Sequence, residues 1–189
     1  MNYHNLTYPD QNNGDGLTVV LWLSGCPHHC FNCQNPQTWD ENSGIEFDIE
    51  AKKELFDELS KDYISGITFS GGDPLHENNI IEVNNIIQEI KKQFPNKTIW
   101  LYTGYTWEEL FPTVIPTVTL DCLDIDRFVR QQIIKFVRQQ IIKSCNVVID
   151  GPYIDDLRDI TLKWRGSSNQ RVIDVQKTLQ NGEIVLWTD

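Results

Sequence analysis

Three cysteines lie close together near the start of the chain, at Cys26, Cys30 and Cys33. Their spacing is C-x3-C-x2-C, and they directly follow an apolar stretch, residues 17–23, that predicts a buried strand. Three thiolates on one short loop can hold one face of a cubane iron–sulfur cluster and leave the fourth iron without a protein ligand. An open coordination position is typical of a catalytic metal centre, whereas a structural centre is closed.

A structural zinc site is the main alternative. Such sites commonly have four ligands, arranged as cysteine pairs or as cysteine and histidine pairs. Here His28 or His29 would have to supply the fourth ligand from inside the same tight loop, which is sterically awkward. We expect both histidines to be exposed loop residues, and a zinc-stabilised binding module remains as the non-enzymatic hypothesis.

A second candidate segment is the turn Ser-Gly-Gly-Asp-Pro-Leu at residues 70–75, which follows a short predicted strand at 66–69. Gly71 and Gly72 have no Cβ, so their backbone can approach a ligand closely. Asp73 adds an acceptor for an ammonium group. On composition alone, this segment is ordinary turn chemistry.

Predicted strands and helices alternate along the chain. The strands are expected at residues 17–23, 66–69, 98–102 and 146–149, the helices at 50–63, 78–94 and 124–144, and a late hairpin at 172–175 and 184–187 around Asn181-Gly182. This order predicts an α/β fold with a parallel sheet and right-handed crossovers. Ligands of such sheets bind at the carboxyl ends of the strands, so the cysteine loop and the Gly-Gly-Asp turn should converge there.

Composition narrows the class of protein. The 189 residues suit a single domain spanning 1–189, and the formal charge of −11 disfavours nucleic-acid binding. No long apolar run predicts a membrane span, and the polar start of the chain is unlike a signal peptide, so a cytoplasmic location is expected. The odd total of five cysteines argues against a disulfide framework, and Cys122 and Cys145 are not expected to bind metal.

One octapeptide, FVRQQIIK, occurs twice in tandem at residues 128–143. Eight helical residues turn the chain by roughly 80° beyond two full turns, so the second copy cannot continue the apolar face of the first. Either the helix grows by roughly 12 Å or one copy loops out. We interpret the duplication as an insertion without a function of its own. The sequence does not settle whether the tail, residues 174–189, is ordered.

The pattern C-x3-C-x-aromatic-C, with Phe31 as the aromatic residue, resembles the signature of the radical S-adenosylmethionine (SAM) superfamily. The resemblance implies that the three cysteines bind a 4Fe–4S cluster and that the amino and carboxylate groups of SAM bind the open iron. It also implies SAM contacts from two segments, namely Asn32, Cys33 and Gln34 beside the cluster, and Gly71, Gly72 and Asp73, which match a GGE-like motif with Asp in place of Glu.

Further segments resemble the glycyl-radical activating enzymes, in the branch that acts on anaerobic ribonucleoside-triphosphate reductases. They are residues 13–16, 36–39, 70–75, 100–105, 150–153 and 164–170, and the similarity covers most of residues 1–171. The duplicated octapeptide and the tail after Val172 depart from the pattern. The Trp-Arg-Gly-Ser-Ser-Asn-Gln segment at 164–170 is the most telling of this branch.

The resemblance implies a partial (β/α) barrel of radical SAM type and a defined reaction. A flavodoxin-like protein reduces the cluster, SAM is cleaved to methionine and a 5′-deoxyadenosyl radical, and this radical takes a hydrogen atom from a glycine on the large subunit of the reductase. The protein's part is to orient the cofactor and exclude side reactions. Other small radical SAM enzymes, of the pyruvate formate-lyase activase or deazaguanine synthase type, are the alternative enzyme hypothesis.

Overall fold

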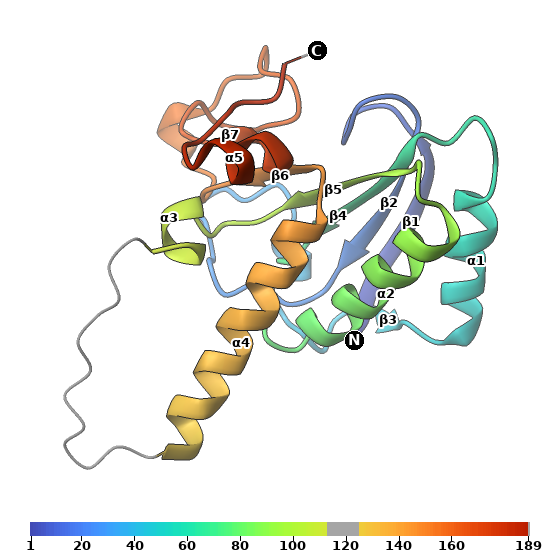
Figure 1. Cartoon of the computed structure of the whole chain (residues 1–189), viewed down its shortest axis with the longest axis horizontal. Coiled ribbons are helices and arrows are strands. Elements are labelled where there is room, and N and C mark those ends of the chain that lie inside the picture. Colours follow the sequence, from blue (N-terminus) through green and yellow to red (C-terminus); the bar gives the residue numbers. More distant parts are fainter. Residues whose placement is uncertain (113–124, 189) are drawn as a thin grey trace.

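A seven-stranded sheet organises the part of the chain that the computed structural model describes, residues 1–112 and 125–188 (Figure 1). The strands are β1 Asn2–Asp10, β2 Thr18–Leu23, β3 Ile45–Glu46, β4 Gly66–Gly71, β5 Thr98–Tyr102, β6 Val147–Asp150 and β7 Arg171–Asp174. Their order in the sheet is β3-β1-β2-β4-β5-β6-β7. The central strands β2, β4, β5 and β6 are parallel, while β1, β3 and β7 are antiparallel to their neighbours.

The predicted α/β class and the parallel centre of the sheet are confirmed, but a barrel is not. The sheet ends at β3 on one side and at β7 on the other, so it is open. Closing a sheet into a barrel requires the strand number, tilt and stagger to agree around a full ring. Here only four strands run parallel, and antiparallel strands flank them on both sides.

Helices cover one face of the sheet. The helices are α1 Ile49–Leu59, α2 Ile80–Gln93, α3 Trp107–Leu110, α4 Ile125–Ser144 and α5 Val175–Asn181, and short 3₁₀ turns occur at Pro36–Thr38 and Asp155–Leu157. Figure 1 shows α1, α2 and α4 on the same side of the strands. The helical periodicity predicted α1, α2 and α4 to within a few residues; position 124, where the third of these was expected to begin, lies outside the described residues. No helix in the described ranges has the length and apolarity that crossing a bilayer requires.

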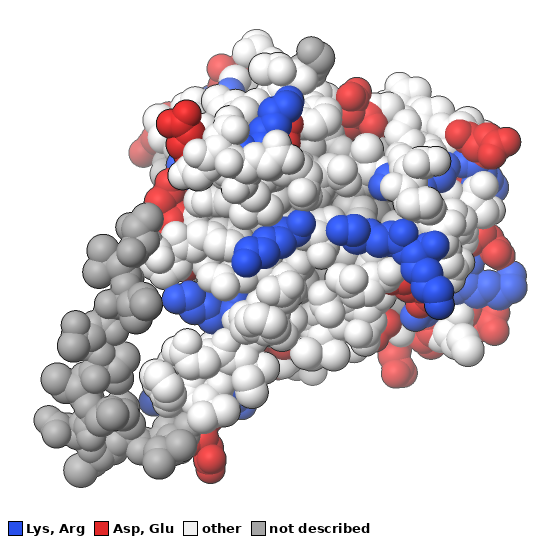
Figure 2. All heavy atoms as spheres, in the orientation of Figure 1, with Lys and Arg blue, Asp and Glu red and all other residues white. Residues whose placement is uncertain are grey.

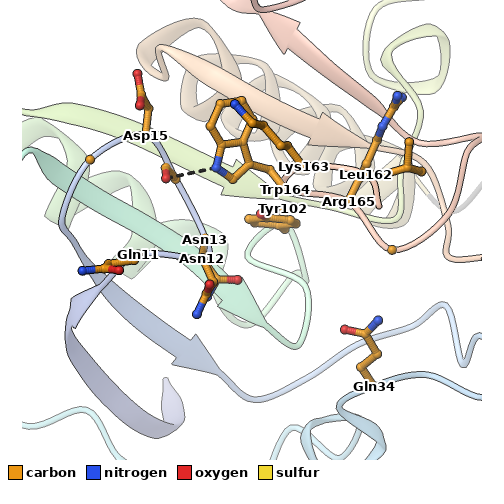
Figure 3. Close-up of a pocket in the computed structure, with 13 residues that line it drawn as sticks. Gln11, Asn12, Asn13, Asp15, Gln34, Tyr102, Leu162, Lys163, Trp164 and Arg165 are labelled. Atoms are coloured by element: carbon orange, nitrogen blue, oxygen red, sulfur yellow. Dashed lines mark hydrogen bonds between the residues drawn. The ribbon is translucent and has the colours of Figure 1, made fainter. Parts of the chain in front are cut away.

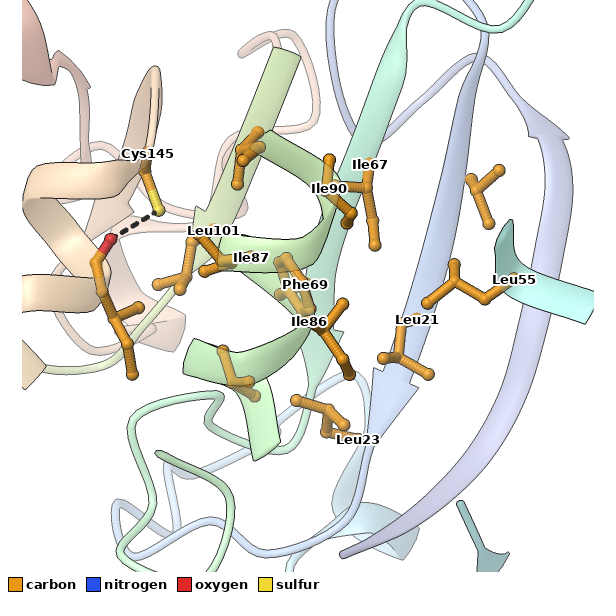
Figure 4. Packing of buried hydrophobic residues seen from close by; sticks show 14 of the residues in the cluster. Leu21, Leu23, Leu55, Ile67, Phe69, Ile86, Ile87, Ile90, Leu101 and Cys145 are labelled. Carbon is orange, nitrogen blue, oxygen red and sulfur yellow. Dashed lines mark hydrogen bonds between the residues drawn. The ribbon is translucent and has the colours of Figure 1, made fainter. Parts of the chain in front are cut away.

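Alternating side chains divide the strands between two apolar clusters. Leu21, Phe69 and Leu101 face the helices and pack with the isoleucines of α2 (Figure 4). On the opposite face, buried Trp100 of β5 meets the rings of Trp164 and Trp187 at centroid distances of 5.0 and 5.7 Å. Because successive strand residues point to opposite faces, β5 and β6 contribute to both clusters, whereas β2 and β4 contribute only to the cluster under the helices.

The predicted late hairpin is correct in its pairing and wrong in its connection. The amide of Asp174 donates to the carbonyl of Val185 at 2.9 Å, and that of Trp187 to Val172 at 2.8 Å. A helix, α5, lies between the two segments in place of a tight turn. Asp174 begins this helix by accepting from the amide of Lys177, and Gly182 ends it in a left-handed conformation, with φ of 75°.

Both copies of the octapeptide lie within the single helix α4. Ile141 and Ile142 of the second copy are fully buried, whereas Ile133, the counterpart of Ile141 in the first copy, is 55% exposed. The projecting half of α4 presents a largely uncharged surface in the view of Figure 2. Val129 and Phe136 of this helix are also exposed. Of the two outcomes that the rotation allowed, the helix has therefore grown in length and no copy loops out.

Deleting eight residues tests whether the duplication matters. Removal of either copy gives the same polypeptide, and its remaining copy adjoins Ser144 and can occupy the buried positions of residues 136–143. We expect the free energy of unfolding to change by less than about 1 kcal/mol, because the positions lost are mostly exposed. Urea unfolding and iron content after reconstitution measure this. Loss of the iron–sulfur cluster in the shortened chain would show that the insertion is functional.

Candidate functional site

A cavity of about 180 Å³ opens where the carboxyl ends of β2, β4, β5 and β6 meet. Its lining includes the three clustered cysteines and the Gly-Gly-Asp turn, as the topology of a parallel sheet predicts. The residues that line it are Asn13, Trp22, Cys26, His28, Cys30, Cys33, Gln34, Asn35, Ser70, Gly71, Gly72, Asp73, Tyr102, Thr103, Gly104, Gly151, Tyr153, Gly166 and Gln170. Six separate segments of the chain therefore contribute to one site.

The cysteine loop leaves β2 through Gly25, whose φ of 90° is a conformation that glycine adopts without strain. Backbone hydrogen bonds fix its start: the amide of Gly25 donates to Thr38 at 2.8 Å and that of Cys26 to Trp39 at 3.0 Å. The three cysteines are free thiols of intermediate exposure. The loop is thus anchored before Cys26, and its thiols remain accessible from the cavity.

The donors of the loop bear on whether it holds a cluster or a single metal ion. Among the described residues, no three Cys, His, Asp or Glu side chains are gathered closely enough to hold one ion. In a cubane cluster each cysteine binds a different iron, so the sulfur atoms need not converge on a point. The donor set, three thiols from one loop facing one cavity, fits a 4Fe–4S cluster better than a mononuclear zinc site.

Burial keeps two of these thiols protonated in the protein without metal. Burial raises the pKa of Cys26 to about 11, and it also raises the pKa of Cys30. A thiolate is the form that binds metal, so cluster assembly must displace these protons.

The Gly-Gly-Asp turn packs directly on the cysteine loop. The amide of Gly72 donates to the carbonyl of Leu23, and that of Asp73 to the carbonyl of Gly25, both at 2.7 Å. A Cβ on Gly72 would lie 2.5 Å from the oxygen of Gly25, so no larger residue fits without moving the backbone. These glycines therefore permit two loops to touch, a role that the sequence alone could not separate from turn formation.

The Asp73 carboxylate is buried, with 1% of its surface exposed, and it is surrounded by donors. Its oxygens accept hydrogen bonds from the amides of Leu75 and Gly104, at 2.8 and 3.1 Å, and from the hydroxyl of Thr103 at 2.9 Å. A fourth partner is Nε2 of His28, at 2.7 Å. Asp73 thus joins β4, β5 and the cysteine loop, in addition to lining the cavity.

Of the predicted SAM contacts, Asn32 alone is absent from the cavity lining. Its backbone is left-handed, with φ of 53°, and its side chain donates to Asp155 at 2.9 Å on the exposed side of the loop. Gln34 does line the cavity, as predicted. The prediction that His28 is an exposed loop residue was wrong, because 17% of its side chain is accessible. Spacing gives no signal for this, since its partner Asp73 is 45 residues away.

A second concavity, of about 590 Å³, adjoins the first. The two share Asn13, Gln34, Tyr102 and Gly166 as lining residues. Figure 3 shows its walls, where the indole of Trp164 donates to the carbonyl of Gly14 at 3.0 Å. Trp164, Arg165 and Gly166 therefore line the second concavity, and Gly166 and Gln170 of the same segment line the first.

Two further groups that the sequence singled out are structural. Cys145 is fully buried, its thiol lies 3.3 Å from the carbonyl of Ile141, and burial raises its pKa to about 12. Asp150, at the end of β6, accepts from the amide of Trp107 at 2.8 Å and pairs with Arg171. Cys122 lies outside the described residues.

Comparison with known proteins agrees with this site. A family model described as a 4Fe-4S single cluster domain matches residues 12–173. An anaerobic ribonucleoside-triphosphate reductase-activating protein of Enterobacteria phage T4 is 38% identical over 172 residues, which cover 91% of this chain and 93% of that protein. The protein of the same name from Escherichia coli K12 is 36% identical, over 91% of this chain and 97% of its own.

The chain belongs to this family of activating proteins. A relative of the same name in Vibrio cholerae is 34% identical and covers 90% of the chain. The family membership supports an iron–sulfur cofactor. Cys26, Cys30 and Cys33, which line one cavity, are the candidate ligands for it.

Proposed function

We propose that this protein generates a glycyl radical on an anaerobic ribonucleoside-triphosphate reductase by cleaving SAM reductively at a 4Fe–4S cluster. The observation that carries the proposal is that the three cysteines and the Gly-Gly-Asp turn line one cavity at the carboxyl ends of parallel strands. The names of the relatives supply the target of the reaction.

Cys26, Cys30 and Cys33 would hold the cluster, and Gly71, Gly72 and Gln34 would bind SAM beside it. A cluster bound there supplies the electron that splits SAM into methionine and a 5′-deoxyadenosyl radical, which then takes the glycine hydrogen. The cavity of about 180 Å³ is smaller than ordinary ligand sites, which span roughly 300–1,000 Å³. We therefore assign the adenosine to the adjoining concavity between residues 11–16 and 162–166.

The same proposal includes three expectations from the sequence. A flavodoxin-like protein acts as the electron donor, the chain works as one domain, and the reaction takes place in the cytoplasm.

The buried Asp73 fixes the position of the SAM-binding turn, since its carboxylate oxygens already have four hydrogen-bond partners within the protein.

The test is to mix the anaerobically reconstituted, dithionite-reduced protein with SAM and a candidate reductase. We expect 5′-deoxyadenosine by chromatography and the doublet of a glycyl radical by electron paramagnetic resonance (EPR), and neither signal without SAM. Cleavage of SAM without the doublet would transfer the protein to another class of small radical SAM enzyme. Stoichiometric zinc and no sulfide in anaerobically purified protein would overturn both enzyme assignments.

A further inference from the structure

His28 lies midway between two of the cysteines, two residues from Cys26 and two from Cys30. Its Nε2 is 2.7 Å from the Asp73 carboxylate. A carboxylate only accepts hydrogen bonds, so Nε2 carries the hydrogen and donates it. The bond therefore connects the middle of the cysteine loop to the turn that contains Gly71 and Gly72.

The ring of His28 packs closely between Gly104 and Tyr105. Gly104 leaves the space on one side, because a Cβ there would lie 2.4 Å from Cδ2 of the imidazole. Tyr105 packs edge to face against the ring, with centroids 4.6 Å apart. Arg138 supports Tyr105 in turn: its guanidinium lies 4.4 Å from the centre of the phenol ring and donates to the hydroxyl at 2.9 Å.

The neighbouring histidine provides a contrast. His29 is exposed, has a left-handed backbone with φ of 45°, and lies edge to face on Trp39 at 4.9 Å. The partner of His28, in comparison, is the Asp73 carboxylate, which is 1% exposed and accepts hydrogen bonds from three donors besides His28. Of these two histidines, His28 thus joins the middle of the loop to a buried and already fixed anchor.

We propose that His28 is a positioning residue, whose hydrogen bond to Asp73 sets the cysteine loop against the Gly-Gly-Asp turn in the geometry that SAM binding requires. The inference rests on the proposed function and adds a residue to it. Outer partners of this kind orient the groups that bind a metal, and their loss typically costs roughly ten- to hundred-fold in affinity or activity.

Three variants of His28 separate the effect of its N–H donor from the effect of its aromatic ring. His28→Phe keeps an aromatic ring and removes the donor, His28→Gln keeps an N–H donor of similar reach, and His28→Asn keeps an amide that is too short to reach Asp73. His29→Asn is the matched control, because asparagine tolerates the left-handed backbone at that position. If His28→Phe folds poorly, the comparison of His28→Asn with His28→Gln still tests the proposal.

Each variant is measured in two forms, first without the cluster and then after reconstitution. In the protein without cluster, mass spectrometry follows the rate at which iodoacetamide alkylates Cys26, alongside the unfolding temperature. In the reconstituted protein, iron and sulfide are counted, and the Kd for SAM is taken from the change that SAM causes in the EPR spectrum of the reduced cluster.

We expect His28→Phe and His28→Asn to retain iron and sulfide, to raise the Kd for SAM roughly ten- to hundred-fold and to speed alkylation of Cys26. His28→Gln should restore both properties, and His29→Asn should match the wild type. Equal SAM affinity in the Asn and Gln variants would overturn the proposal, as would a parallel loss of unfolding temperature and cluster in all three. A wild-type spectrum that does not respond to SAM would instead contradict the proposed function itself.

Discussion

Replacing Cys26, Cys30 or Cys33 singly with alanine is expected to abolish the formation of 5′-deoxyadenosine from SAM. All three thiols face one cavity, and each would bind a different iron of the cluster. Two remaining thiols leave a second iron without a protein ligand, so the cluster is lost or loses its single open position. Chromatography of the product after anaerobic reconstitution, together with iron and sulfide analysis, measures the effect.

Cys145→Ala is the matched control for these substitutions. It makes the same chemical change at a thiol that is fully buried among apolar side chains of the helical layer (Figure 4). We expect wild-type cluster content and SAM cleavage from this variant, with a small loss of stability from the vacated volume. Cys122→Ala should likewise retain wild-type cluster content and SAM cleavage. Full activity in any of the three loop variants would contradict the ligand assignment.

Arg171→Met is expected to lower the free energy of unfolding by roughly 3 kcal/mol, since removal of one partner leaves a buried charge uncompensated. Asp150 is 1% exposed at the end of β6, and Nε of Arg171 donates to it at 3.0 Å. Arg171 also donates to both carboxylate oxygens of Glu108, which joins β7 to α3. Methionine retains most of the side-chain volume but no donor. Urea unfolding of the protein without cluster measures the loss.

Arg130→Met is the comparison, at an exposed ion pair between α4 and the segment before α2. Its partner Glu77 is 3.2 Å away, and both side chains are well exposed, at 69% and 46%. An exposed pair of this kind contributes about 0–1 kcal/mol, so the variant should unfold close to wild type. Adding Asp150→Asn to Arg171→Met should recover part of the lost stability, because it removes the buried charge. If the two arginine variants were equally stable, the structural role given to Arg171 would be wrong.

The kind of metal site could be predicted because the residues that indicate it lie close together in the sequence. The spacing of the three cysteines limits the metal that one loop can hold, and the double glycine after a strand limits the side of the sheet where a ligand approaches. The periodicity of residues 80–93 likewise required a helix with one apolar face. The strand β1, which pairs with both β2 and β3, was missed, because most of its residues are polar and no alternation marks it.

Contacts between distant segments could not be predicted in this way. The sequence placed His28 on the surface and could not assign its partner, since Asp73 reaches it only when β4 and the cysteine loop are brought together by the sheet. Asn32 stands beside a cysteine in the sequence but is directed to Asp155 by its left-handed backbone. Adjacency along the chain does not determine on which side of a loop a side chain lies.

The sequence by itself determined that three thiols lie on one loop, that the central strands β2, β4, β5 and β6 alternate with the helices α1, α2 and α4, and at which edge of the sheet these segments meet. Composition, spacing and periodicity act over a few residues, so they suffice for these features. The tertiary structure decided that Asp73 anchors the cysteine loop, that residues 162–166 line the second concavity, and that identical octapeptides have different surroundings. The physical reason is the same in each case. Hydrogen bonding and burial depend on which distant groups the packed sheet brings within contact, and no local pattern records those partners.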